Sequence, residues 1–131
     1  MREILFRGKT HKGEWLYGSL EIKYGWRIIE GKRQIDHRIC DVNDNCENVD
    51  PTTIGQYTGL TDKNGKKIFE GDIVLFYGTL YNEIFSIVFA YGCFRLGTKN
   101  GFSYTLHNLY SALEVIGNIH DNPELLKGGA E

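Results

Sequence analysis

The sequence predicts an all-β protein: an SH3-like barrel with an additional small N-terminal antiparallel sheet and a short C-terminal helical turn. The chain has 16 Gly and only 2 Pro among its 131 residues. Short apolar runs separate these glycines, which is typical of sheets built from hairpins. The span 53–77 adds a hairpin signal, a glycine–aspartate corner and an apolar strand in direct succession.

Two turns determine the geometry expected for the span 53–77. Asn64 and Gly65 separate two apolar segments, and an Asn-Gly pair tolerates the positive φ angles of a tight hairpin loop. Gly71 and Asp72 predict a second corner, because Gly accepts a costly backbone angle and an Asp carboxylate accepts hydrogen bonds from backbone N–H groups. Residues 73–77 are apolar on both faces, which indicates a buried central strand of the kind that follows such corners in small SH3-like barrels.

Alternation predicts a meander in the N-terminal part of the chain. Over residues 14–23, Leu16 and Leu20 fall on one face, whereas Trp15 and Tyr17 fall on the other and would lie side by side in solvent. The remaining expectations here are a first strand at 4–7, a turn at 24–25, a short strand at 26–30 and a further strand at 33–40.

The second half of the chain continues the β pattern. Asn100 and Gly101 predict a second Asn-Gly hairpin loop. Asn, Pro and Glu at 122–124 are typical of a helix start. The expected elements are a core strand at 83–91, strands at 93–98 and 102–106, a helical turn at 109–113, a last strand at 114–119 and a short helix ending at 128–129.

Residues 41–51 are the predicted linker between two lobes. The segment contains four acidic residues, three Asn and almost no side chain that could be buried. This placement gives an N-terminal sheet over 1–50 and a barrel lobe with its C-terminal tail over 51–131, and the two lobes can pack as one unit.

The composition narrows the cellular compartment and the kind of partner that we expect. No run approaches the roughly 20 apolar residues that span a bilayer, and charges near the start interrupt any signal-peptide core. Three irregularly spaced Cys are not a disulfide framework. Cys40 and Cys46 could form a bridge if oxidised, but we expect reduced thiols. We therefore expect a cytoplasmic protein without a membrane partner.

The distribution of charge and aromatic residues marks a candidate interaction surface in the first 38 residues. This stretch holds nine Lys or Arg against five acids, although the whole chain has a net charge of -2. Bases can stack on aromatic rings while cations track phosphates. Aromatic residues are equally enriched in protein interfaces, and we favour that second role. The candidate surface consists of Trp15, Tyr17, Tyr24, Trp26 and Arg27.

No pattern predicts a metal or cofactor site. His37, Cys40 and Cys46 are suitable ligand types, but they lack a CxxC knuckle and a fourth ligand, so a packed His37 is the better interpretation. The sequence from Asp41 resembles the opening of a calcium loop, yet the required Gly and Glu are missing at its sixth and twelfth positions.

Catalytic motifs are equally weak. There is no Gly-x-Ser-x-Gly elbow, the Cys residues have no His at a motif spacing, and residues 59–66 only partly match a phosphate loop. Glu70 and Asp72 could form a carboxylate pair, but their turn explains them better. We expect no catalytic residue, no cofactor and no small-molecule substrate.

Several motifs together resemble the YopX family of small phage and prophage proteins. They are QYTGL at 56–60, the DKNG turn at 62–65 and EGDIV at 70–74, with matching segments at 1–7 and 114–125. The resemblance implies an all-β fold with an SH3-type barrel and no established activity, so it supplies no catalytic residues.

The expected function follows from these exclusions and from the resemblance. We expect a non-catalytic phage or prophage accessory protein that serves as a protein-interaction or assembly module, with self-association through the face of Trp15 and Tyr17. The alternative is a single-stranded nucleic-acid-binding protein that uses the basic aromatic N-terminal face.

Overall fold

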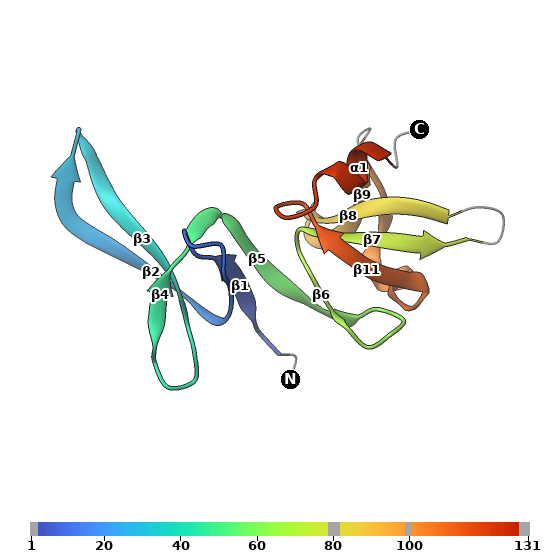
Figure 1. Ribbon diagram of the computed structural model, residues 1–131, viewed down its shortest axis with the longest axis horizontal. Coiled ribbons are helices and arrows are strands. Elements are labelled where there is room, and N and C mark those ends of the chain that lie inside the picture. Colours follow the sequence, from blue (N-terminus) through green and yellow to red (C-terminus); the bar gives the residue numbers. More distant parts are fainter. Residues whose placement is uncertain (1–2, 79–81, 99–100, 129–131) are drawn as a thin grey trace. The chain divides into compact units, whose positions relative to one another are not determined.

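The computed structural model describes residues 3–78, 82–98 and 101–128 and divides the chain into two compact units, Met1–Gln56 and Tyr57–Glu131. The expected all-β class is confirmed, and the order of elements is drawn in Figure 1. The strands are β1 (Phe6–Lys9), β2 (Trp15–Ile29), β3 (Lys32–Cys40), β4 (Cys46–Asn48), β5 (Asp50–Thr61), β6 (Lys67–Phe69), β7 (Asp72–Tyr77), β8 (Asn82–Ala90), β9 (Cys93–Thr98), β10 (Gly101–Thr105) and β11 (Leu113–Asn118).

The first unit is an antiparallel meander, as expected. Strand β2 pairs with β1 over its first four residues and with β3 over the rest, while β4 pairs with the end of β3. The first half of β5 pairs with the other edge of β1. Among the described residues of this unit, Ile39, Cys40 and Val49 are the buried hydrophobic residues, whereas many of its other large apolar side chains are exposed.

The segment 41–51 is not a linker, which corrects the prediction. It contains the β3–β4 turn, strand β4 and the start of β5, and the backbone N–H of Val49 donates to the carbonyl of His37 at 2.9 Å. The polar composition that suggested a linker instead belongs to an exposed hairpin turn. The chain passes from the first unit to the second within β5, at 56–57.

The predicted turn at Tyr24–Gly25 and the separate strand after it are also wrong. Strand β2 continues through Gly25 to Ile29, so β2 and β3 form one long hairpin. The chain reverses at Glu30 and Gly31, whose φ angles are 52° and 77°. Two successive positive φ angles are the requirement of a type I′ turn, which suits the twist of a hairpin.

The second unit contains the main hydrophobic core. Its sheet has the strand order β10-β9-β8-β7-β11, while β6 pairs with the second half of β5. The predicted central strand is confirmed, since Ile73 and Val74 on β7 are fully buried. No sheet in the described part of the chain closes on itself, so the SH3-like barrel stays a prediction. The core cluster consists of Ile68, Val74, Phe85, Ile87, Leu96, Leu106 and Leu113.

Two predicted turns of this unit, at Asn64-Gly65 and Gly71-Asp72, lie where the sequence placed them. Gly65 and Gly71 have φ angles of 82° and 92°, and Gly101 opens β10 with a φ of 127°. Asp72 is buried and its carboxylate accepts a hydrogen bond from the backbone N–H of Phe69 at 2.7 Å. Asn64 lies in the β5–β6 turn and donates its backbone N–H to Asp62, whereas Asn100 falls outside the described residues.

The C-terminal part also follows the prediction. A 3-10 turn, η2 (Tyr110–Ala112), precedes β11, and the helix α1 covers Glu124–Gly128. A second 3-10 turn, η1 (Leu106–Asn108), was not predicted. No helix among the described residues combines the length and the apolar character needed to cross a membrane.

Candidate functional site

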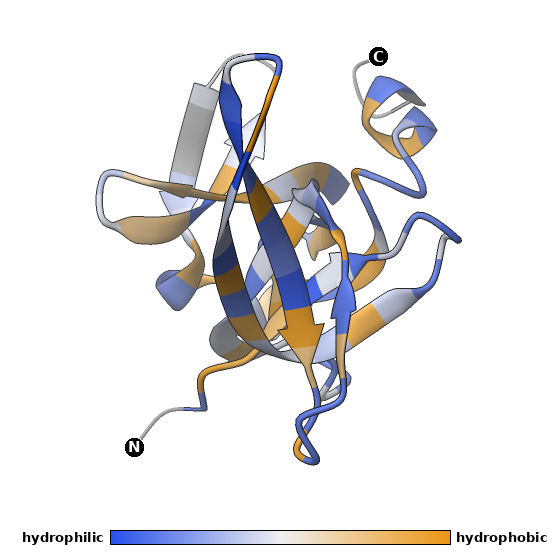
Figure 2. Cartoon of the chain, turned by 90° about the vertical axis from the view of Figure 1, so that its left-hand side faces the viewer, coloured by the Kyte–Doolittle hydropathy of each residue, from blue (hydrophilic) through white to orange (hydrophobic). Residues whose placement is uncertain are grey.

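The β2–β3 hairpin exposes several large apolar side chains to solvent. Residues 22–37 of this hairpin lie beyond the part that β1 and β4 flank, so β2 and β3 pair there without another strand of the described residues. We call this two-stranded part the arm. It is the end of the first unit drawn in light blue and cyan in Figure 1, and apolar and polar segments alternate along it in Figure 2. The exposed apolar residues of the arm are Ile22, Tyr24, Trp26, Ile28, Ile29 and Ile35.

A large bulge at residues 25–27 positions the Trp26 side chain of the arm. Tyr24 pairs with Ile35 and Ile28 pairs with Arg33, so three residues of β2 lie opposite one residue of β3. Bulges bend a strand and redirect its side chains. Gly25 permits the close approach of the strands here, because a Cβ atom at this position would lie 3.0 Å from the carbonyl oxygen of Gln34. Trp26 on the bulge is 89% exposed.

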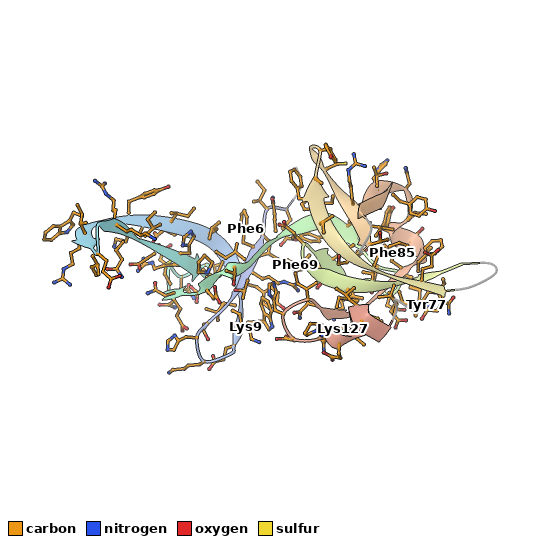
Figure 3. The ribbon with its side chains drawn as sticks, turned by 90° about the horizontal axis from the view of Figure 1, so that it is seen from above. Phe6, Lys9, Phe69, Tyr77, Phe85 and Lys127 are labelled. Carbon is orange, nitrogen blue, oxygen red and sulfur yellow. A yellow bond between two sulfur atoms is a disulfide. The ribbon has the colours of Figure 1, made fainter. Side chains whose placement is uncertain are left out.

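The distal arm is positively charged. Between residues 23 and 33 the exposed charged side chains are Lys23, Arg27, Lys32 and Arg33 against the single acid Glu30, a balance of +3. Side chains project from both faces of the ribbon in Figure 3. The arm therefore offers apolar and cationic groups together, and no other strand within residues 3–56 pairs with it.

The candidate surface divides into two places. Trp15 is half-buried, with the Arg7 guanidinium 4.9 Å and the Lys9 ammonium 5.8 Å from its ring centroid. Tyr17 is half-exposed on the same face of β2. Trp15 and Tyr24 are nine residues apart on one strand, which is about 30 Å at the rise of a β-strand. The structure groups Tyr24, Trp26 and Arg27 on the arm and places Trp15 at its base.

Cys40 and Cys46 form a disulfide, which corrects the expectation of reduced thiols. They are directly opposite in the β3–β4 register, with Cα atoms 4.0 Å apart. The Glu21 carboxylate lies beside them, and one of its oxygens is within 4.8 Å of both sulfurs. Sequence spacing could not indicate Glu21, because it comes from β2. His37 is an odd number of residues from Cys40 and therefore falls on the opposite face of β3.

The calcium-like loop uses its first carboxylate for its own turn. Asp41 Oδ1 accepts hydrogen bonds from the backbone N–H groups of Asn43 at 2.9 Å and Asn45 at 3.0 Å. The bonds from Asn45 and then Asn43 hold the pKa of Asp41 below its ordinary value. Such an Asx turn accounts for the Asp and Asn residues here without an ion.

The most buried carboxylates of the second unit join segments of the backbone. Asp62 accepts hydrogen bonds from the N–H groups of Lys66 at 2.9 Å and Val115 at 2.9 Å, as well as from Asn64. Burial is the largest single influence and raises the pKa of Asp62, but the three backbone donors and the Lys66 charge together outweigh it and lower the pKa. Asp62 thus ties the β5–β6 turn to β11, a role that the turn motif alone did not predict.

The hollows of the first unit that the structure describes are shallow and open to solvent. One has a volume of about 520 Å³ and lies between the turn after β1 and strands β3 and β4. A second, of about 610 Å³, lies beside the same turn and is lined by residues such as Lys9 and Thr53. Ligand sites are clefts or cavities that enclose most of a ligand's surface, and these open hollows are not of that kind.

Comparisons with known proteins agree with the motifs. The family model described as "YopX protein" matches residues 5–127. Among solved structures, the crystal structure of protein EF1440 from Enterococcus faecalis is similar, with 27% sequence identity and a TM-score of 0.54, and the match covers 96% of this chain and 99% of that one. No curated protein matches the chain.

Proposed function

The chain belongs to the YopX family, and from that premise we propose that it is a non-catalytic interaction module whose recognition element is the β2–β3 arm. It would act as a phage or prophage accessory protein in the bacterial cytoplasm, on a protein partner or on a second copy of itself. The observation that carries the proposal is the set of exposed apolar side chains along a hairpin that pairs with no further strand in the part of the chain the structure describes.

The energetics of the arm support this role. A two-stranded hairpin is marginal in water unless it packs on something else. Soluble monomers rarely expose contiguous apolar patches, and large ones mark interaction sites. Trp26, Tyr24 and Ile28 would lose most of their exposed surface on docking, and buried aromatic anchors dominate many protein interfaces.

The main test is retention of partners from a bacterial lysate by the full chain, with and without nuclease. We expect proteins to be retained by the wild type, lost in the double variant Trp26→Ala/Ile28→Ser and unaffected by nuclease. Tyr91→Ala is the matched control, because Tyr91 is an 84% exposed aromatic residue of the second unit. Equal retention by the arm variant and the wild type would refute the proposal.

Light scattering tests whether the partner is a second copy. If the arm mediates self-association, the wild type should form an oligomer at high concentration and the double arm variant should be a monomer. A wild type that remains strictly monomeric excludes self-association and leaves a different protein as the partner.

The second candidate function is single-stranded nucleic-acid binding through the same arm. Its support is the balance of +3 over residues 23–33 together with Tyr24 and Trp26. Each stacked base contributes about 1–3 kcal/mol, and phosphate contacts make affinity fall with salt. This candidate predicts binding that weakens in Arg27→Ala and Trp26→Ala and decreases with salt concentration. Absence of binding at low salt would exclude it.

A further inference from the structure

The disulfide region contains a group of metal-ligand atoms that the arm does not use. Sulfur atoms of Cys40 and Cys46 and a carboxylate oxygen of Glu21 lie within 4.8 Å of one another. Donor atoms around a tetrahedral zinc are about 3.5–3.8 Å apart, given bond lengths of about 2.0–2.3 Å. Small side-chain rotations would therefore bring three donors to one ion once the two sulfurs are no longer bonded to each other.

We propose that the reduced chain binds one thiophilic divalent cation of the Zn²⁺ class through Cys40, Cys46 and Glu21. The inference is independent of the role of the arm in partner recognition. It also departs from the expectation of no metal site, because the sequence spacing tested His37 as the third ligand and strand β2 supplies Glu21 instead.

Charge favours a divalent cation at this position. Two thiolates and one carboxylate contribute -3, and the Arg38 guanidinium beside Glu21 contributes +1. A divalent cation would bring the group to neutrality. Arg38 binds Oε1 of Glu21 through Nε at 2.8 Å and through a terminal nitrogen at 2.6 Å. Coordination through Oε2 would leave both contacts in place, and Arg38 would then orient the ligating carboxylate as outer-shell partners do.

The site is accessible from solvent. Cys46 is half-buried and lines the polar hollow of about 520 Å³, together with Arg38 and Asn48. These three residues and Glu21 share one face of the sheet, as the β2–β3 and β3–β4 registers show. A reductant and a cation can both approach from this hollow, and the fourth coordination position would face it and hold water.

Occupation requires a thiol reductant. Two thiols of a cytosolic dithiol transfer two electrons and two protons to the Cys40–Cys46 bridge, which gives two cysteine thiols and an oxidised dithiol. Binding of the cation then releases the two thiol protons, because thiolates are the ligands. The bridge and the metal site are thus alternative states of the same two sulfurs.

The experiment is anaerobic titration of the reduced full chain with Co²⁺, followed by displacement with Zn²⁺. We expect one equivalent of Co²⁺ to give thiolate charge-transfer and tetrahedral d–d absorption. Cys46→Ser should abolish this spectrum, and Glu21→Gln should weaken the affinity at least tenfold. The oxidised chain should not bind.

Two control variants make the result specific. Cys93→Ser removes the free thiol of the second unit, and His37→Ala removes the imidazole on the opposite face; neither should change the titration. Because Glu21 is on the surface, Glu21→Gln should fold even if Cys46→Ser does not, and circular dichroism checks both. A reduced chain without the spectrum, a spectrum that persists in folded Cys46→Ser, or wild-type affinity in Glu21→Gln would each overturn the proposal.

Discussion

The second unit and the β2–β3 arm both contain many large apolar side chains, but they use them in opposite ways. In the second unit, Phe85, Ile87 and Leu96 are at most 1% exposed. In the arm, Ile22, Tyr24, Trp26 and their neighbours are 43–89% exposed. Burial of apolar surface is the main source of folding free energy. The second unit therefore holds the stability of the protein, whereas the apolar residues of the arm contribute little to it.

The largest expected effect is on the core of the second unit. Phe85→Ala should lower the free energy of unfolding by about 3–5 kcal/mol, because it removes a fully buried ring and leaves a cavity. Urea unfolding followed by tyrosine and tryptophan fluorescence measures this change. A loss below about 1 kcal/mol would mean that burial in the second unit contributes little to the folding free energy. The proposed difference between the second unit and the arm would then be wrong.

The next effect concerns Asp62, whose carboxylate joins two segments of the same unit. Asp62→Ala should cost about 2–3 kcal/mol, because three backbone N–H groups lose a charged acceptor. The pKa of Asp62 is lowered in the folded state from its ordinary value of 3.8. Its contribution is therefore present above that value and is lost as the pH falls through the folded pKa.

Acid unfolding separates this effect from simple loss of packing. Between about pH 5 and pH 2 the wild type should lose more stability than Asp62→Asn, which has no carboxylate to protonate. Asp41→Asn is the comparison, because Asp41 makes the same kind of turn on the exposed surface of the other unit and its pKa is also lowered, so it should reduce the pH dependence less than Asp62→Asn. If the free energy of unfolding falls equally with pH in the wild type and in Asp62→Asn, the role assigned to the Asp62 carboxylate is wrong.

A smaller effect is expected from the disulfide of the first unit. The bridge closes a loop with a sequence separation of 6, and the chain-entropy estimate for such a loop is about 2 kcal/mol. Reduction should therefore increase amide hydrogen exchange in β3 and β4 and leave β7 and β8 unchanged. Equal changes in both regions would show that the two units unfold together.

The two regions also differ in how well the sequence predicts them. In the second unit the turns were predicted correctly, because Asn64-Gly65 and Gly71-Asp72 impose local backbone angles that tertiary contacts do not override. In the first unit, Tyr24-Gly25 suggested a turn but forms part of a bulge. A glycine permits several backbone geometries, and the pairing of β2 with β3 selects among them.

Sites that depend on pairing between strands were the hardest to predict. Glu21 meets Cys40 and Cys46 only because β2 and β3 are in one particular register, and that register is absent from the linear spacing. The same reason explains Asp62, whose bond to Val115 joins residues 53 positions apart. Trp15 and Tyr17 lie on one face of β2, as alternation predicts. Alternation within β2 could not show that Arg7 and Lys9 of the neighbouring strand β1 lie over the Trp15 ring.

The smallest expected effect on stability is the most informative for function. Trp26→Ala should change the free energy of unfolding by less than about 0.5 kcal/mol, since the ring is 89% exposed and surface substitutions rarely cost more. The same variant should lose most partner retention, whereas Tyr91→Ala should lose neither stability nor retention. A Trp26→Ala protein that unfolds more easily would show that the arm is a structural element, because only a ring packed in the free protein can stabilise it.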